Sequence, residues 1–493
     1  MNGAIWSIEV DMPQKSLKAN AFLNTLKTVL TLFFPLITFP YSSRVLGPDN
    51  IGKVNFAQSV VSYFAIVASL GISTYATREA AKVRDNPSLL NKIATEIFLI
   101  NMAATIVSYA LLAVALVFVG KFDDYRLLII ICSSLIIFTT VGMGWLYQAV
   151  EDYFYITIRS LVFQVVSVVL LFALVKTKED YAWYAAVNVI SNVGANILNF
   201  FHSRKYIRFS FKSNFEIKKH LKSIFVLFAT TIVGSIFASI DTTMLGFLSS
   251  DSEVGFYSAG MKLIHMVNGI FPAMIIVIFP RVSYYFASGD EKSILHLSSK
   301  TVNFLLCFSM PIAVGLCLLM NPLVLVFCGG KYIEAVSVAQ TMCPYLIFSA
   351  LGHFFGGTIL VAKGKEKQQL YSLLFSVSLD VVLNFLLIRG YGAKGAAFAT
   401  LISQVVMTLT YMLLLHDFIR RLSIKFSFLQ FFLSSLVMGI SVCFVRNLFS
   451  NLILQIFVPF VAGVAVYATM LFVLRNRMFL EACGDVFRKF RKR

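Results

Sequence analysis

Long apolar stretches separated by short polar segments run through the whole chain. Each stretch is roughly 20 residues long, which is the length that an α-helix needs to cross the hydrocarbon core of a bilayer. Helices are expected because a bilayer offers an open backbone no hydrogen-bond partners. We therefore predict an all-α membrane protein with about fourteen transmembrane helices. Their expected ranges are residues 21–43, 54–77, 93–119, 127–148, 153–175, 182–201, 223–247, 255–279, 297–320, 334–361, 370–389, 395–415, 428–448 and 453–475.

The longest polar interval, residues 202–222, lies between the sixth and seventh predicted helices. It contains seven Lys and Arg residues and a single acid, Glu216. A basic loop in the middle of a membrane protein is typical of a cytoplasmic connector between two helical bundles.

An internal repeat supports this division. SVVLLFALV at 167–175 aligns with DVVLNFLLI at 380–388, with five of the nine positions identical. RVLGPDNIGKVNFAQSV in the first half also parallels TMLGFLSSDSEVGFYSAGMKL in the second half. Parallel repeats of six helices, which face each other across a cavity, are typical of transporters. Four glycines of the second pair of segments are expected in tight turns: Gly47, Gly52, Gly246 and Gly255.

The pattern thus predicts two pseudo-symmetric six-helix lobes around a central cavity, plus two extra C-terminal helices. The expected organisation is a cytoplasmic tail (1–20), the N-terminal lobe (21–201), a basic cytoplasmic linker (202–222), the C-terminal lobe (223–415), two additional helices (428–475) and a basic cytoplasmic tail (476–493).

The distribution of charge predicts the orientation. The chain is 58% hydrophobic and only 13% charged, yet its formal net charge is +18. With the N-terminus in the cytoplasm, the inner segments hold 29 Lys and Arg residues and the outer loops hold 10. This bias follows the positive-inside rule and places both termini in the cytoplasm. It also explains the net charge without a nucleic-acid partner, since no zinc-finger or RNA-binding motif accompanies it.

This topology makes a direct prediction. A cysteine at position 213 should react with an impermeant thiol reagent only from the cytoplasm, and a cysteine at position 252 only from the periplasm, because one position lies in the basic linker and the other in an outer turn. Cysteine-accessibility labelling of the Ser213→Cys and Ser252→Cys variants measures this. Labelling of both positions from the same side would contradict the two-lobe topology.

Motifs of enzymes and metal sites are missing from the sequence. The seven cysteines form no CxxC pair, and no Walker A, HExxH or GxSxG motif occurs. We therefore predict a transporter and not an enzyme, with no catalytic residue, metal site or cofactor. The first twenty residues lack an apolar core, so we expect no cleaved signal peptide and insertion through the first helix.

Four segments resemble the polysaccharide biosynthesis membrane proteins, the O-antigen flippases. The resemblance covers about residues 15–425 and is distributed over Pro40–Asn86 (beginning PYSSRVLGPDNIGKVNFAQSV), Gly144–Gln164 (GWLYQAVEDYFYITIRSLVFQ), Ser239–Leu263 (SIDTTMLGFLSSDSEVGFYSAGMKL) and Gly390–Val406 (GYGAKGAAFATLISQVV). This family shares a superfamily with multidrug and toxin extrusion transporters and lipid II flippases.

The resemblance implies a bacterial inner-membrane flippase for an undecaprenyl-pyrophosphate-linked oligosaccharide, with a basic cavity and cation coupling. It also implies membrane lipids as partners, with a polysaccharide polymerase and chain-length proteins as further candidates. The alternative is a multidrug/cation antiporter of the same superfamily, which needs an acidic, aromatic cavity. A saccharide polymerase or ligase would need a large periplasmic loop, which the sequence lacks.

Lys27 is the first candidate for substrate binding. Asn24 and Lys27 lie on one face of the first predicted helix, and a cation facing a cavity could bind a diphosphate. Alternatively, Lys27 reaches the cytoplasmic headgroups. Arg44, Arg78 and Arg159 lie near helix ends, where each could bind phosphate through two hydrogen bonds or anchor the helix at the interface.

Ionisable residues further inside the predicted helices are the remaining candidates, because a charge in the bilayer is costly. We expect Asp241 and Lys262 to form an ion pair, with phosphate competing for Lys262 and a proton or sodium ion competing for Asp241. Asp380 lies near mid-membrane and is the second candidate for cation coupling, and His353 could be its partner. Alternatively, Asp241 and Lys262 form a permanent structural ion pair, and Asp380 only joins helices.

A row of asparagines in the sixth predicted helix could bind sugar hydroxyls or neighbouring helices. Its members are Asn188, Asn192, Asn196 and Asn199.

Overall fold

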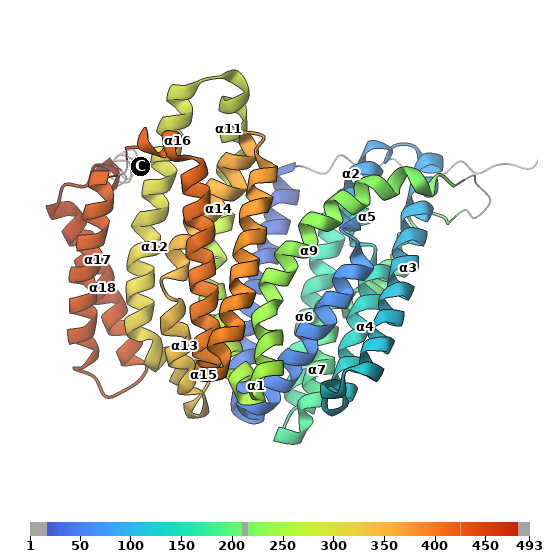
Figure 1. The fold of residues 1–493 in the computed structure, drawn as a ribbon, viewed down its shortest axis with the longest axis horizontal. Helices are drawn as coiled ribbons and strands as arrows, with labels where there is room; N and C mark the ends of the chain where they lie inside the picture. Colours follow the sequence, from blue (N-terminus) through green and yellow to red (C-terminus); the bar gives the residue numbers. More distant parts are fainter. Residues whose placement is uncertain (1–16, 210–214, 424, 482–493) are drawn as a thin grey trace, which may run out of the picture.

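The computed structural model describes residues 17–209, 215–423 and 425–481, and these residues form helices joined by short turns, with no β-strand (Figure 1). Among them, eleven helical segments are long and apolar enough to cross a membrane. The prediction of an all-α, multi-pass membrane protein is confirmed.

The first half of the chain, residues 17–209, contains eight α-helices and three short helical segments. They are α1 (Leu17–Ser69), α2 (Ile72–Lys82), α3 (Pro87–Phe118), η1 (Gly120–Tyr125), α4 (Arg126–Gly142), α5 (Gly144–Ala149), α6 (Tyr153–Leu174), η2 (Lys178–Asp180), α7 (Tyr181–Val189), η3 (Ile190–Gly194) and α8 (Asn196–Ser203).

The second half, residues 215–481, lies beside the first in Figure 1, with α17 and α18 at its outer edge. Its elements are α9 (Ile217–Leu248), α10 (Asp251–Asn268), α11 (Ile270–Ser288), α12 (Glu291–Phe327), η4 (Gly330–Tyr332), α13 (Glu334–Met342), α14 (Tyr345–Phe354), η5 (Phe355–Leu360), α15 (Glu366–Leu414), α16 (His416–Arg420), α17 (Lys425–Arg446) and α18 (Leu454–Val473).

Two of the long helices are each broken by a glycine. Gly47 in α1 has φ 77°, and Gly392 in α15 has φ 53°, which is backbone that residues with a side chain rarely adopt. Pro48 follows Gly47 and suits the first turn of the helix that restarts there. The count of fourteen transmembrane helices stays a prediction, since the eleven apolar segments include these two broken helices and leave out the interrupted stretch from α7 to α8.

The first turns of α9 are fixed on the first half of the molecule. The ring of His220 contacts Glu96 Oε2 on α3 through Nε2 (2.8 Å) and Tyr75 Oη on α2 through Nδ1 (2.7 Å). Glu96 is only 2% exposed, and its Oε1 accepts the backbone N–H of Glu216 (2.8 Å). These contacts explain why α9 begins at Ile217, inside the segment predicted to be a linker.

The two halves meet closely where α1 crosses α10. A Cβ atom on Gly52 would lie 1.8 Å from the carbonyl oxygen of Asp251, and one on Gly255 would lie 2.2 Å from that of Pro48. Gly52 and Gly255 therefore lie within helices and permit a backbone-to-backbone contact, so the prediction that they form turns is wrong. Gly246 also lies within a helix, against the ring of Phe56. Small residues play this role in membrane helix pairs because they let two backbones approach.

Hydroxyl groups extend this contact along α1 and α9. Ser62 Oγ lies 3.2 Å from Ser239 Oγ, and Thr243 Oγ1 lies 3.0 Å from Ser59 Oγ and 3.1 Å from Tyr63 Oη. We call these five residues the hydroxyl seam. The seam lies toward the C-terminal end of α9, at the end of the molecule opposite the first turns of α9 (Figure 1). The halves are thus joined at the side predicted to be periplasmic.

Candidate functional site

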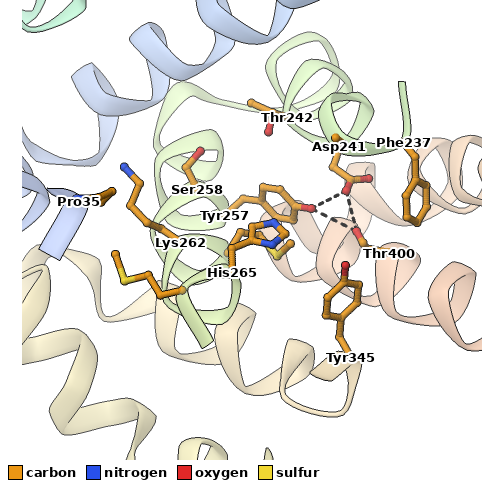
Figure 2. A pocket seen from close by; sticks show the side chains of 13 residues that line it. Pro35, Phe237, Asp241, Thr242, Tyr257, Ser258, Lys262, His265, Tyr345 and Thr400 are labelled. Carbon is orange, nitrogen blue, oxygen red and sulfur yellow. Dashed lines mark hydrogen bonds between the residues drawn. The ribbon is translucent and has the colours of Figure 1, made fainter. Parts of the chain in front are cut away.

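A cavity of about 440 Å³ lies in the second half, next to α1. Helices α9, α10, α14 and α15 supply most of its described lining, and Pro35 of α1 completes it. Figure 2 shows Asp241 and Thr400 at one end of this cavity and Lys262 beside Pro35 at the other. The cavity therefore places a buried acid and a cation in one space.

Asp241 is held by hydrogen bonds from two neighbouring helices. Its Oδ2 accepts the hydroxyl of Tyr257 on α10 (2.5 Å) and lies 2.8 Å from the hydroxyl of Thr400 on α15 (Figure 2). Its Oδ1 accepts an N–H from Asn384 on α15 (2.6 Å). The carboxylate is thus fixed where α9, α10 and α15 meet.

Asp380 lies one turn before Asn384 on α15, and the same amide group links it to Asp241. Asn384 Nδ2 lies 3.3 Å from Asp380 Oδ2, and both side chains are 0% exposed. Asp380 Oδ1 and Asn384 Oδ1 are buried and make no hydrogen bond within the described residues. Two carboxylates therefore share one amide donor, with two buried oxygens beside them that can still accept a hydrogen bond or bind a cation.

This arrangement joins two residues that the sequence suggested separately. Asp241 was expected to pair with Lys262, and Asp380 with His353. Among the described residues neither pair exists, and both predictions are wrong. The Lys262 ammonium lies over the ring of Phe39 on α1, 4.0 Å from its centroid, and His353 is exposed on the surface of α14. Burial explains why these pairs do not form. Both acids lie inside helix interfaces, where hydroxyl and amide groups hydrogen-bond to them in place of Lys262 and His353.

Tyr257 and Thr400 were missed as site residues. Both lie in segments that carry the family resemblance, SDSEVGFYSAGMKL and GYGAKGAAFATLISQVV, but neither is charged. The spacing of hydroxyl residues gives no sign of which helix they face.

The structure does not bring the predicted arginines to this cavity. Arg44 is exposed, and its guanidinium donates to the carbonyl of Val326 on α12, which links the two halves. Arg78 is exposed and pairs with Glu79 at 3.0 Å. Arg159 lines a separate cavity between α6 and α8. Asn24 and Lys27 lie within α1, where side chains are outside the described part of the structure, so their role stays a prediction.

The asparagine row in α7, η3 and α8 donates mainly to backbone carbonyl groups. Asn188 and Asn192 donate to carbonyl groups one turn earlier, and Asn199 donates to the carbonyl of Gly142 on α4 (2.7 Å). Asn196 Oδ1 accepts from Arg159 (3.3 Å). Asn196 and Asn199 thus contact neighbouring helices. Asn188 and Asn192 bond within their own helical stretch, and sugar binding by the row stays a prediction.

The fold is that of a known class of membrane transporters. A structure described as the lipid II flippase MurJ in an inward closed conformation matches 93% of this chain and 99% of its own, with a TM-score of 0.69 and 16% sequence identity. An inward-facing multidrug resistance transporter of the MATE family matches 82% of this chain and 98% of its own, with a TM-score of 0.62 and 14% identity.

Sequence comparison then defines the family. The model of the family described as "Polysaccharide biosynthesis protein" matches residues 17–286, more than half of the chain, and the MatE model matches residues 227–386. A protein named "Putative O-antigen transporter" from Escherichia coli K12 is 23% identical over 395 residues, which cover 80% of this chain and 95% of the relative. The chain belongs to the polysaccharide biosynthesis protein family. The resemblance drawn from the sequence is confirmed, and so is the prediction of a transporter instead of an enzyme.

Proposed function

We propose that this protein flips a lipid-linked oligosaccharide, an undecaprenyl-pyrophosphate-linked repeat unit of an O-antigen or capsule, across the bacterial inner membrane. The observation that carries the proposal is the cavity beside α1, which contains a cation and a buried acid. The relative from Escherichia coli, named as an O-antigen transporter, supports this substrate class. An inner-membrane location, cytoplasmic termini, and polymerase and chain-length partners belong to the same proposal.

Lys262 is the proposed contact for the diphosphate. Its ammonium group lies at the α1 side of the cavity, next to Pro35 (Figure 2). It also lies over the ring of Phe39. An anionic group that enters between α1 and α10 would meet this charge, and a partly desolvated cation binds phosphate more strongly than one in water. Lys27 is the second proposed contact, on the sequence argument alone. Substrate binding by Asn24, Arg44, Arg78 and Arg159 stays a prediction.

Asp241 and Asp380 are the proposed sites of cation coupling. Two buried carboxylates that share one amide donor repel each other, so a proton or a sodium ion bound there relieves the repulsion. Carboxylate, amide and hydroxyl oxygens from α9 and α15 are suitable ligands for a hard cation. Binding would draw α9 toward α15, and α9 also carries part of the hydroxyl seam. The cation would thereby affect how the two halves meet during alternating access.

A multidrug/cation antiporter remains the second candidate, and the cavity lining is the observation that favours it. Phe237, Tyr257 and Tyr345 surround Asp241, and an acid among aromatic rings can bind an organic cation. The position of Lys262 in the same cavity argues against such a cargo, because it repels a second cation.

Reconstitution into liposomes distinguishes the two functions. We expect the protein to move a fluorescent undecaprenyl-diphosphate-linked oligosaccharide between leaflets in a manner that depends on a sodium or proton gradient. Lys262→Ala should reduce the initial rate about tenfold, and Lys262→Arg should keep part of it, since a hydrogen bond to a charged group contributes about 1.5–3 kcal/mol. Transport of an organic cation without movement of the lipid-linked glycan would overturn the proposal in favour of the antiporter.

A further inference from the structure

A second cavity, of about 450 Å³, lies between α6 and α8 in the first half. It shares no lining residue with the cavity around Asp241. One wall consists of side chains that are exposed on the outside of the helix bundle: Phe154, Ile158, Val162 and Leu198. In a membrane protein, exposed apolar side chains of this kind face lipid tails, so this cavity opens toward the bilayer.

The other end of the cavity is cationic. Arg159 and Lys205 line it, together with the ring of His202. Arg159 Nη1 donates to the carbonyl of Ala195 (3.1 Å), but its Nε is buried and makes no hydrogen bond within the described residues. His202 stacks on Tyr155 with 3.9 Å between ring centroids, and its Nε2 is likewise buried without a hydrogen bond. Two cationic side chains and an imidazole ring therefore lie at one end of an otherwise apolar groove.

The single acid in this lining does not cancel the positive charge. Asp152 Oδ2 accepts the hydroxyl of Tyr206 (2.7 Å) and lies 3.9 Å from His202 Nε2, beyond hydrogen-bond distance. Arg159 and Lys205 together exceed its charge by one. The groove thus offers a net positive charge and N–H donors to an acceptor beside an apolar wall.

We propose that this groove is a binding site for an anionic phospholipid of the surrounding leaflet. The phosphate would lie against Arg159 and Lys205, and an acyl chain would follow Ile158, Val162 and Leu198. Arg159 is six residues after Tyr153, which begins α6, so it lies roughly 9 Å along the helix at a rise of about 1.5 Å per residue. A phosphate group at Arg159 and the first carbons of its acyl chains at Ile158 and Val162 would thus lie side by side along α6. The occupied site would hold α6 against α8.

Native mass spectrometry of the full chain tests this inference. The purified protein is titrated with phosphatidylglycerol and, separately, with phosphatidylcholine carrying the same acyl chains. We expect phosphatidylglycerol to bind at least about fivefold more tightly, and Lys205→Glu to remove this preference, because it reverses one of the two charges. The matched control is Arg204→Glu, which changes the neighbouring exposed cation outside the cavity lining and should leave the preference unchanged.

Several results would overturn the inference. Equal binding of the two lipids, or an equal effect of Lys205→Glu and Arg204→Glu, would show that the groove does not recognise a headgroup. Displacement of phosphatidylglycerol by inorganic phosphate at similar concentration would show that the apolar wall contributes nothing. Much tighter binding of undecaprenyl phosphate would assign the groove to the transported lipid. Val162→Trp, which fills the groove from its lipid-facing wall, should weaken phosphatidylglycerol binding without changing either charge.

Discussion

A disulfide between positions 62 and 239 is expected to stop transport, and a reductant is expected to restore it. The hydroxyl oxygens of Ser62 on α1 and Ser239 on α9 are 3.2 Å apart, so cysteines at both positions can form a bond of about 2.0 Å with little movement. The proposed alternating access would require the two halves to separate at the hydroxyl seam. We expect the oxidised Ser62→Cys/Ser239→Cys variant to lose more than about nine-tenths of its flipping rate in liposomes.

The matched control lies inside one half. Thr105 on α3 and Thr140 on α4 have hydroxyl oxygens 2.7 Å apart, and both are buried in the first half. The disulfide of a Thr105→Cys/Thr140→Cys variant should leave transport unchanged, since it joins helices that move together. Oxidised wild-type protein controls for the native cysteines. Equal activity of the two oxidised pairs would show that the seam does not open during transport.

Loss of cation dependence is the expected result of Asp241→Asn. An amide has no charge to hold a proton or a sodium ion, so gradient-driven flipping should fall about tenfold or more. The N–H group of the introduced amide would also lie against the N–H and O–H groups that now donate to Asp241. An unsatisfied buried polar group costs about 1–3 kcal/mol. The thermal midpoint in detergent should therefore fall as well. Comparing flipping rates with and without a sodium or proton gradient measures the coupling directly.

Two further variants separate coupling from stability. Asp417→Asn makes the same chemical change at an exposed acid of the second half and should alter neither property. The exchange Asp241→Asn with Asn384→Asp keeps one carboxylate and one amide at the shared contact, so it should regain part of the gradient dependence. If the single variant Asp241→Asn folds and still responds to the gradient as wild type does, Asp241 does not couple transport to the cation, and the proposal is wrong.

Much of the architecture could be predicted from the sequence because bilayer-length apolar runs have one stable solution, the helix. The segments around Gly47 and Gly255 also carried enough signal to indicate the family. The functions of the glycines were not accessible in the same way. A glycine in a turn and a glycine at a helix crossing look alike in the sequence. They differ in whether a second backbone lies against the glycine, which only the structure shows.

The candidate site was predicted residue by residue but not as a whole. The cost of burying charge singled out Asp241, Lys262 and Asp380. Which of them meet depends on the rotation of each helix about its axis, and this is set by packing between distant segments. Asn384 joins the two acids because α9 and α15 cross at that point, 143 residues apart in the chain. No local spacing could have revealed it.

Two boundaries lie at different positions along α9. One is the start of the predicted C-terminal lobe, and the other is the point where the helix is bonded to α15. As a repeat in the sequence, the second half starts after the basic linker. Mechanically, the first turns of α9 belong to the first half, where His220 is bonded to Glu96 and Tyr75, while Asp241 near the other end is bonded to α15. The start of the predicted C-terminal lobe and the part of α9 that is bonded to α15 are therefore different positions along one helix. We therefore expect a hinge between the moving parts to lie along α9, between His220 and Asp241, and we expect that lengthening or shortening the linker leaves the motion unaffected.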